Sequence, residues 1–197
     1  METDIVTIYK ILPDFEHYCA FTLPMTHVLQ VIGKTIPATK LMHFYKHNLY
    51  LKSVWADIAA TFEPVEGVAT TDKIPDVTVW VPGTLVLSTS AVETLGDIED
   101  YGELLPVETP AGRYWILNCM RQINADEQYS ANITNAGQVL DVETLQFRDE
   151  EANRAGLFKT PFDGYRNVFC SQELKDSIQQ AKLGGLKFSD QLVSGRE

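Results

Sequence analysis

Residues 157–188 of the chain read LFKTPFDGYRNVFCSQELKDSIQQAKLGGLKF, and they contain the clearest structural signals in the sequence. Two short apolar runs, at 157–159 and 168–170, lie on either side of the turn-forming pair Asp163-Gly164. Apolar runs that flank such a turn are typical of two antiparallel strands. The sequence therefore predicts a β-hairpin close to the C-terminus.

A helix is expected directly after this hairpin. Leu174, Ile178 and Ala181 fall at helical spacing and form one apolar stripe. Ser171 is suited to cap the first turn, and Gly184 is suited to stop the helix. The module contains no nucleophile, base or metal cluster, so it predicts well-defined structure without catalytic chemistry.

The N-terminal part of the chain gives one strand and one helix. Residues 5–12 are rich in β-branched residues and predict a strand. Residues 53–62 place apolar side chains at i, i+3, i+4 and i+7 and predict a helix. Segment 41–51 gives only weak strand signals. Residues 63–76 contain prolines and glycine and are typical of a long loop.

Beyond this loop, strands alternate with turn signals. The motif Ser90-Ala-Val-Glu93 matches a capping box and predicts a short helix with Ser90 as its cap. Residues 124–140 are polar and resemble a loop, and residues 145–147 are expected to form a short strand. The other expected strands lie at 77–81, 85–87, 104–107 and 114–118.

These elements predict an α+β fold with a mixed or antiparallel sheet and a few short helices. Strands and helices do not alternate regularly enough for a doubly wound parallel sheet. The loop before residue 76 is the best candidate for a boundary. We therefore expect an α+β region at 1–75 and a second α+β domain at 76–197, packed as two subdomains.

Most of the net charge of −11 lies in one quarter of the 197-residue chain. Residues 61–110 contain ten acidic residues and a single basic one, Lys73. Direct nucleic-acid binding is disfavoured, because affinity for phosphates comes largely from Lys and Arg. A basic protein partner would instead be attracted and steered. A solvated acidic surface that only aids solubility is the alternative.

The cysteines and the N-terminus indicate a cytoplasmic protein without membrane association. Cys19, Cys119 and Cys170 are far apart, which is typical of reduced thiols rather than a disulfide framework. The first residues lack the layout of a secretory signal. No apolar run approaches the roughly 18 residues that a membrane span requires.

Candidate catalytic residues are sparse. His43 and His47 form an H-x-x-x-H pair that would place both imidazoles on one face of a helix, as metal ligands do. The pair lacks the glutamate of a zinc-protease motif and an obvious third ligand, so ordinary surface histidines are the simpler interpretation. Cys170 precedes a helix, where a thiolate is stabilised, but no base is identified beside it. We expect no metal and no cofactor.

The acidic segment offers a candidate binding surface instead. A tyrosine among carboxylates suits a contact with a basic protein surface, because tyrosines are enriched among the residues that dominate binding energy. The candidate partner-binding residues are Asp97, Glu99, Asp100, Tyr101 and Glu103.

The segment from residue 85 to the C-terminus resembles immunity protein family 11 of bacterial polymorphic toxin systems, formerly a domain of unknown function. Three blocks carry the likeness, and their order and spacing make it more specific than any block alone. They are LVLSTSAVETL with ELLPV at 103–107, GRYWILN at 112–118 with DEQYS at 126–130, and LFK at 157–159 with VFCSQELK at 168–175 and LGGLKF at 183–188.

The resemblance implies a non-enzymatic immunity protein that binds and neutralises a cognate toxin encoded beside it. It supplies no catalytic residues and does not identify the toxin. It implies that 76–197 is the immunity-family-like domain and that 1–75, which the likeness does not cover, is a variable region. We expect a toxin with a basic surface, and self-association as a homodimer is left open. Two alternatives remain: a scaffold or oligomeric adaptor without a toxin, and a small metal-dependent hydrolase that uses His43 and His47.

Overall fold

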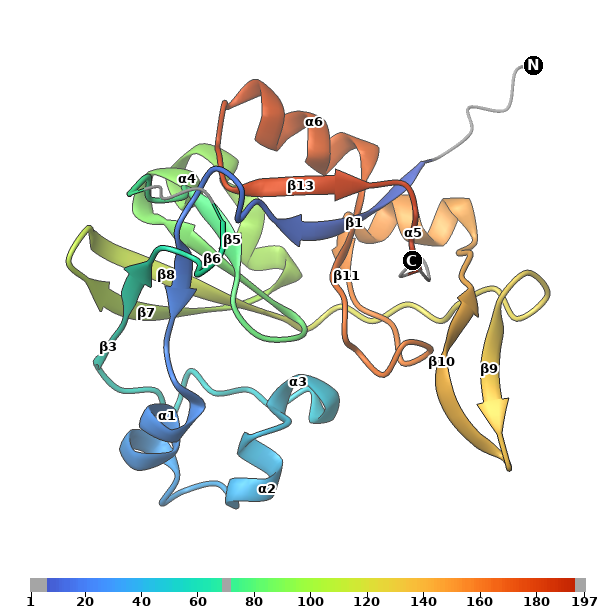
Figure 1. The fold of residues 1–197 in the computed structure, drawn as a ribbon, viewed down its shortest axis with the longest axis horizontal. Coiled ribbons are helices and arrows are strands. Elements are labelled where there is room, and N and C mark those ends of the chain that lie inside the picture. Colours follow the sequence, from blue (N-terminus) through green and yellow to red (C-terminus); the bar gives the residue numbers. More distant parts are fainter. Residues whose placement is uncertain (1–6, 69–71, 194–197) are drawn as a thin grey trace.

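Two β-sheets lie at the centre of the fold in the computed structural model, which describes residues 7–68 and 72–193 (Figure 1). Short helices surround these sheets, so the α+β class and the mixed and antiparallel pairing are confirmed. None of the helices in this part of the chain has the length and apolarity to cross a bilayer.

The larger sheet has the strand order β3-β7-β8-β6-β5. Its neighbours pair antiparallel except β3 and β7, which pair parallel. The strands are β3 (Ile58–Ala59), β5 (Val77–Val79), β6 (Thr84–Ser88), β7 (Gly102–Thr109) and β8 (Gly112–Cys119). The strands expected at 77–81, 85–87, 104–107 and 114–118 are thereby confirmed.

The smaller sheet is antiparallel, with the order β11-β12-β1-β13. It contains the predicted C-terminal hairpin, in which β11 pairs with β12, and it is followed by α6 as expected. Its elements are β1 (Ile8–Pro13), β11 (Leu157–Phe158), β12 (Phe169–Ser171), α6 (Gln172–Gln180) and β13 (Leu186–Ser189).

Strands from both ends of the chain share these sheets. β1 pairs with β12 and β13, and β3 pairs with β7. Hydrogen bonds therefore join segment 1–75 to segment 76–197 in both sheets. The boundary near residue 75 stays a prediction about how the chain divides.

The larger sheet is buried on both faces. Leu85 and Leu87 point into one core, which also contains apolar side chains of α4 (Thr89–Leu95) and α6. Val86, between them, points into a second core because successive strand residues face opposite sides. Helices from residues 25–47 cover that second side (Figure 1). They are α1 (Met25–Ile32), α2 (Ala38–Leu41) and α3 (Phe44–His47).

A third apolar cluster lies next to a projecting hairpin and includes side chains of β11, β12 and residues 142–152. Phe147, Phe158 and Phe169 pack together with ring centroids 4.9–5.8 Å apart. The hairpin extends away from the rest of the fold (Figure 1). The elements here are β9 (Ala131–Asn135), β10 (Gln138–Thr144) and α5 (Asp149–Ala155). A separate pair joins β2 (Ala20–Thr22) to β4 (Thr61–Glu63).

The helix predicted at 53–62 is wrong, because this segment forms β3 and β4. Ile58 is 1% exposed beside Val107 of β7, and Phe62 pairs with Phe21. Ile58 and Phe62 therefore both pack as strand residues at sheet edges. These tertiary pairings outweigh the helical spacing of the sequence. The weak strand signals at 41–51 are also wrong, since this segment forms the end of α2, the whole of α3 and irregular structure, and contains no strand.

The loop predicted at 124–140 is wrong from residue 131 onward, since β9 and the first three residues of β10 lie there. Most of their side chains are exposed, so the alternation that reveals a strand is missing. Residues 145–147, where a strand is expected, instead follow the end of β10 as irregular structure. Ala136 (φ 48°) and Gly137 (φ 78°) form the turn, with alanine in a conformation that favours glycine or asparagine.

Two boundary residues have other roles than predicted. Ser88, not Ser90, caps α4, and its Oγ accepts a hydrogen bond from the Ala91 amide at 3.1 Å. The α6 helix ends at Gln180, before Gly184. Gly184 instead lies against Tyr18, where any side chain would overlap the tyrosine hydroxyl. Ser171 caps α6 as predicted.

Candidate functional site

Three exposed carboxylates form a row on η1 (Asp97–Tyr101), a short 3₁₀ helix between α4 and β7. Ile98 is 2% exposed and anchors this helix in the core, whereas Asp97, Glu99 and Asp100 face solvent. Within the described ranges, these carboxylates form no ion pair and no side-chain hydrogen bond. They are therefore available to a partner. We call them the acidic row.

Tyr101 is half-buried and anchors the end of the acidic row. The guanidinium of Arg121 lies over its ring, 4.7 Å from the centroid, and donates to the carbonyls of Asp100 and Ala155. A Cβ at Gly156 would lie 2.7 Å from the Tyr101 ring, so the absence of a side chain there allows the ring to pack closely. Burial raises the pKa of Tyr101 above the ordinary tyrosine value, and the charge of Arg121 partly opposes this effect. The packed ring thus fixes the position of η1.

A groove of about 220 Å³ joins the acidic row to the C-terminal helices. It brings Asp97 and Tyr101 of η1 next to Glu173 of α6, and the Glu173 charge contributes to the raised pKa of Tyr101. Sequence reasoning missed Glu173, because an acid in the first turn of a helix is explained by helix capping alone. The groove is also lined by Leu95, Ile98, Asn153, Arg154, Gly156, Ser171, Leu174 and Ser177.

Glu103 lies in the interior, apart from the acidic row. It is 5% exposed, and its carboxylate accepts hydrogen bonds from the Leu51 amide (2.7 Å), the Lys52 amide (2.8 Å) and the Asn118 side chain (2.8 Å). With these partners the carboxylate is held inside the fold and is not free to pair with a basic partner. Of the five candidate residues, Glu103 therefore supports the fold, and the other four border the exposed surface.

The histidine pair does not gather further ligands. His43 and His47 are exposed on either end of α3. In the part of the chain that the structure describes, Asp14, Glu16 and His17 are the grouping close enough to share an ion. Lys187 already bridges two of them, at 3.4 Å from Asp14 and 2.7 Å from Glu16. Within the described residues, His43 and His47 therefore lack the third ligand that the hydrolase alternative needs.

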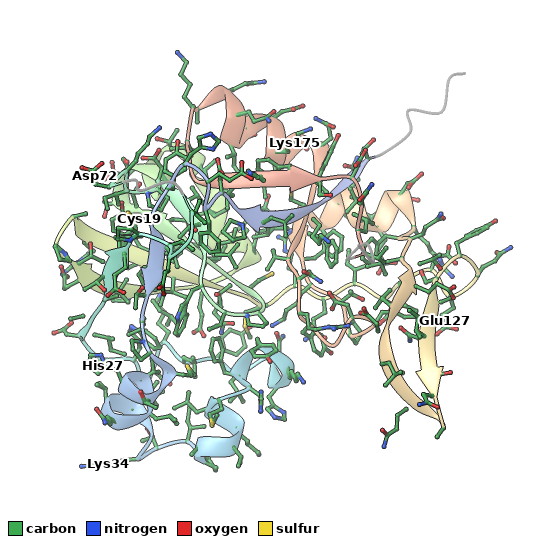
Figure 2. All side chains as sticks on the ribbon, viewed as in Figure 1. Cys19, His27, Lys34, Asp72, Glu127 and Lys175 are labelled. Atoms are coloured by element: carbon green, nitrogen blue, oxygen red, sulfur yellow. The ribbon has the colours of Figure 1, made fainter. Side chains whose placement is uncertain are left out.

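All three thiols are buried and free of disulfides. Burial raises the pKa of Cys119 to about 11 and that of Cys170 to about 12. Cys19 lies near Asp72 (Figure 2), whose charge adds to the effect of burial in raising its pKa. Because the thiolate is the reactive form, these cysteines are poor nucleophiles near neutral pH. This agrees with the expected reduced thiols.

The stability of the protein is expected to fall as pH rises from about 9 to 12. In this window, the folded protein holds the protons of Cys119, Cys170 and Tyr114 to higher pH than the unfolded chain does, since burial raises their pKa values to about 11, 12 and 12. The unfolded chain releases these protons earlier, which favours unfolding. Lys159 has the opposite effect, because burial lowers its pKa from 10.5 to about 8. The unfolded chain therefore holds the Lys159 proton more strongly, which partly offsets the loss of stability up to about pH 10.5.

Chemical denaturation at a series of pH values measures this loss. Replacing Cys119 and Cys170 by alanine should make the free energy of unfolding less dependent on pH between 9 and 11. A slope identical to that of the unchanged protein would contradict the assignment.

Residues 105–193 match the model of the immunity protein family Imm11. The match begins within β7 and includes α6 and β13, and it confirms the resemblance found in the sequence. The acidic row precedes the matched segment, whereas Glu173 lies inside it. None of the curated proteins compared with the chain matches it.

Proposed function

We propose that this chain is a cytoplasmic immunity protein that binds a cognate bacterial toxin and neutralises it by direct contact, without catalysis. The observation that carries the proposal is the match of residues 105–193 to the immunity family. The buried thiols are compatible with it, and so is the position of His43 and His47 outside the grouping of possible metal ligands found in the described residues.

The proposed contact surface is the acidic row together with Tyr101 and Glu173. Its carboxylates are exposed and unpaired within the described residues, so a basic toxin surface can bind them without first breaking ion pairs. Long-range attraction would also speed the encounter. The partner is therefore a protein with a basic surface, and neither nucleic acid nor a membrane is part of the proposed complex.

Co-expression with the adjacent toxin gene tests this function. The chain should restore growth to cells that produce the toxin, and the two proteins should purify together. A toxin from an unrelated locus serves as the control and should remain lethal. Failure of both rescue and co-purification with the adjacent toxin would refute the proposal.

A further inference from the structure

Tyr50 is exposed to an unusual degree for a large ring. Its 72% exposure exceeds that of every other large hydrophobic side chain in the described residues. It follows α3 and precedes Leu51, which is completely buried. An exposed tyrosine adds little to folding stability, but tyrosines are enriched among binding residues because they offer a large surface at small entropic cost.

The backbone that presents Tyr50 is held rigidly. Four hydrogen bonds fix residues 48–52, here called the Tyr50 segment, to β7, β8 and the residue after β8. Two are the bonds from the Leu51 and Lys52 amides to the buried carboxylate of Glu103. The other two run from Asn118 Nδ2 to the Leu49 carbonyl (2.9 Å) and from Asn48 Nδ2 to the Met120 carbonyl (3.0 Å).

This support includes buried polar groups that are incompletely paired. Glu103 is buried without an ion pair to any described residue, and its carboxylate relies on three hydrogen bonds, from the Leu51 and Lys52 amides and the Asn118 side chain. The Oδ1 atoms of Asn48 and Asn118 are buried without a hydrogen-bond partner among the described residues. Buried polar groups are usually satisfied, so such exceptions need an explanation. Pre-organisation of a surface tyrosine for binding provides one.

Tyr50 lines a groove that adjoins the acidic row. The groove has a volume of about 570 Å³ and a mostly apolar lining, and Glu99 of the acidic row forms part of its wall. The Tyr50 groove is lined by Tyr50, Lys52, Ser53, Glu99, Gly102, Glu103 and Leu104. η1 therefore contributes to two grooves, with Asp97 and Tyr101 in the acidic one and Glu99 in this one.

We propose that the Tyr50 groove is the apolar part of the toxin-binding surface. It receives an aliphatic or aromatic side chain of the toxin, beside a lysine or arginine that pairs with Glu99. The proposal rests on the proposed function, and it adds a contact that the acidic row alone does not provide.

A second copy of this chain fits the groove less well. A symmetric dimer uses the same patch on both subunits. The acidic row of one copy would then lie close to the acidic row of the other, and like charges across an interface are strongly unfavourable. Charge complementarity therefore favours a basic partner.

Tyr50→Ala tests the proposal against the purified product of the adjacent toxin gene. Loss of a central tyrosine should weaken binding roughly 30-fold. The dependence of affinity on salt should stay unchanged, because no charge is removed. Tyr129→Ala is the matched control, since Tyr129 is 55% exposed and does not line the groove. Tyr50→Phe should retain most of the affinity, which shows that the ring itself is required.

The outcomes separate the two proposals. If the unchanged protein does not bind the toxin, the proposed function fails. If it binds and Tyr50→Ala binds equally well, only the inference about the groove is wrong. Self-association that Tyr50→Ala abolishes while toxin affinity stays intact would assign the groove to a homodimer and overturn the inference.

Discussion

Reversal of the acidic row to lysine, at Asp97, Glu99 and Asp100, is expected to weaken toxin binding about 100-fold. Each reversal replaces attraction to a basic surface by repulsion, and about 1 kcal/mol for each position gives this factor. All three side chains are exposed and unpaired within the described residues, so the fold should remain stable. Calorimetric titration at several salt concentrations measures the effect.

A matched control separates the position of the charges from net charge. Glu66, Glu127 and Glu143 are also exposed, and their reversal changes the net charge by the same amount. This control should lower the affinity only slightly, through weaker long-range attraction that salt screens. Equal losses in both triple variants would show that the acidic row is not the contact surface.

Glu103→Ala is expected to destabilise the protein by about 3 kcal/mol. The change removes the acceptor for the amides of Leu51 and Lys52 and for the side chain of Asn118. Each donor left unsatisfied in the interior costs about 1–3 kcal/mol, and relief from burying the charge offsets part of the total. Urea denaturation measures the loss. Faster hydrogen exchange at the Leu51 amide should accompany it.

Glu108→Ala provides the comparison on the same strand. Glu108 is exposed and pairs with Arg113 at 2.6 Å, an interaction of about 0–1 kcal/mol at a surface. If both variants lose the same stability, Glu103 is not the buried support that the structure indicates.

The sequence predicts the fold best where apolar pattern and boundary residues agree. The strands at 104–107 and 114–118 and the helix capped by Ser171 are of this kind. Residues 53–62 are predicted wrongly, because their apolar spacing reflects two separate strand pairings rather than one helical face. The β9–β10 hairpin is not predicted, because its exposed strands are mostly polar and lack the alternation of apolar and polar residues that indicates a strand.

The candidate site is predictable only where its residues lie close together in the sequence. Asp97, Glu99 and Asp100 are adjacent in sequence, so their clustering is visible without a structure. The burial of Glu103 is not visible, because it depends on the Leu51 and Lys52 amides about fifty positions earlier. The proximity of Glu173 to η1 and the exposure of Tyr50 likewise depend on tertiary packing.

The most direct test of the account is a titration of toxin activity with the purified protein. A protein that acts by occupying the toxin should reduce the activity linearly, to zero at a fixed molar ratio. The same end point should be reached at once and should not change with longer incubation. Complete inactivation by a small fraction of an equivalent, progressing with time, would reveal catalysis and contradict the account.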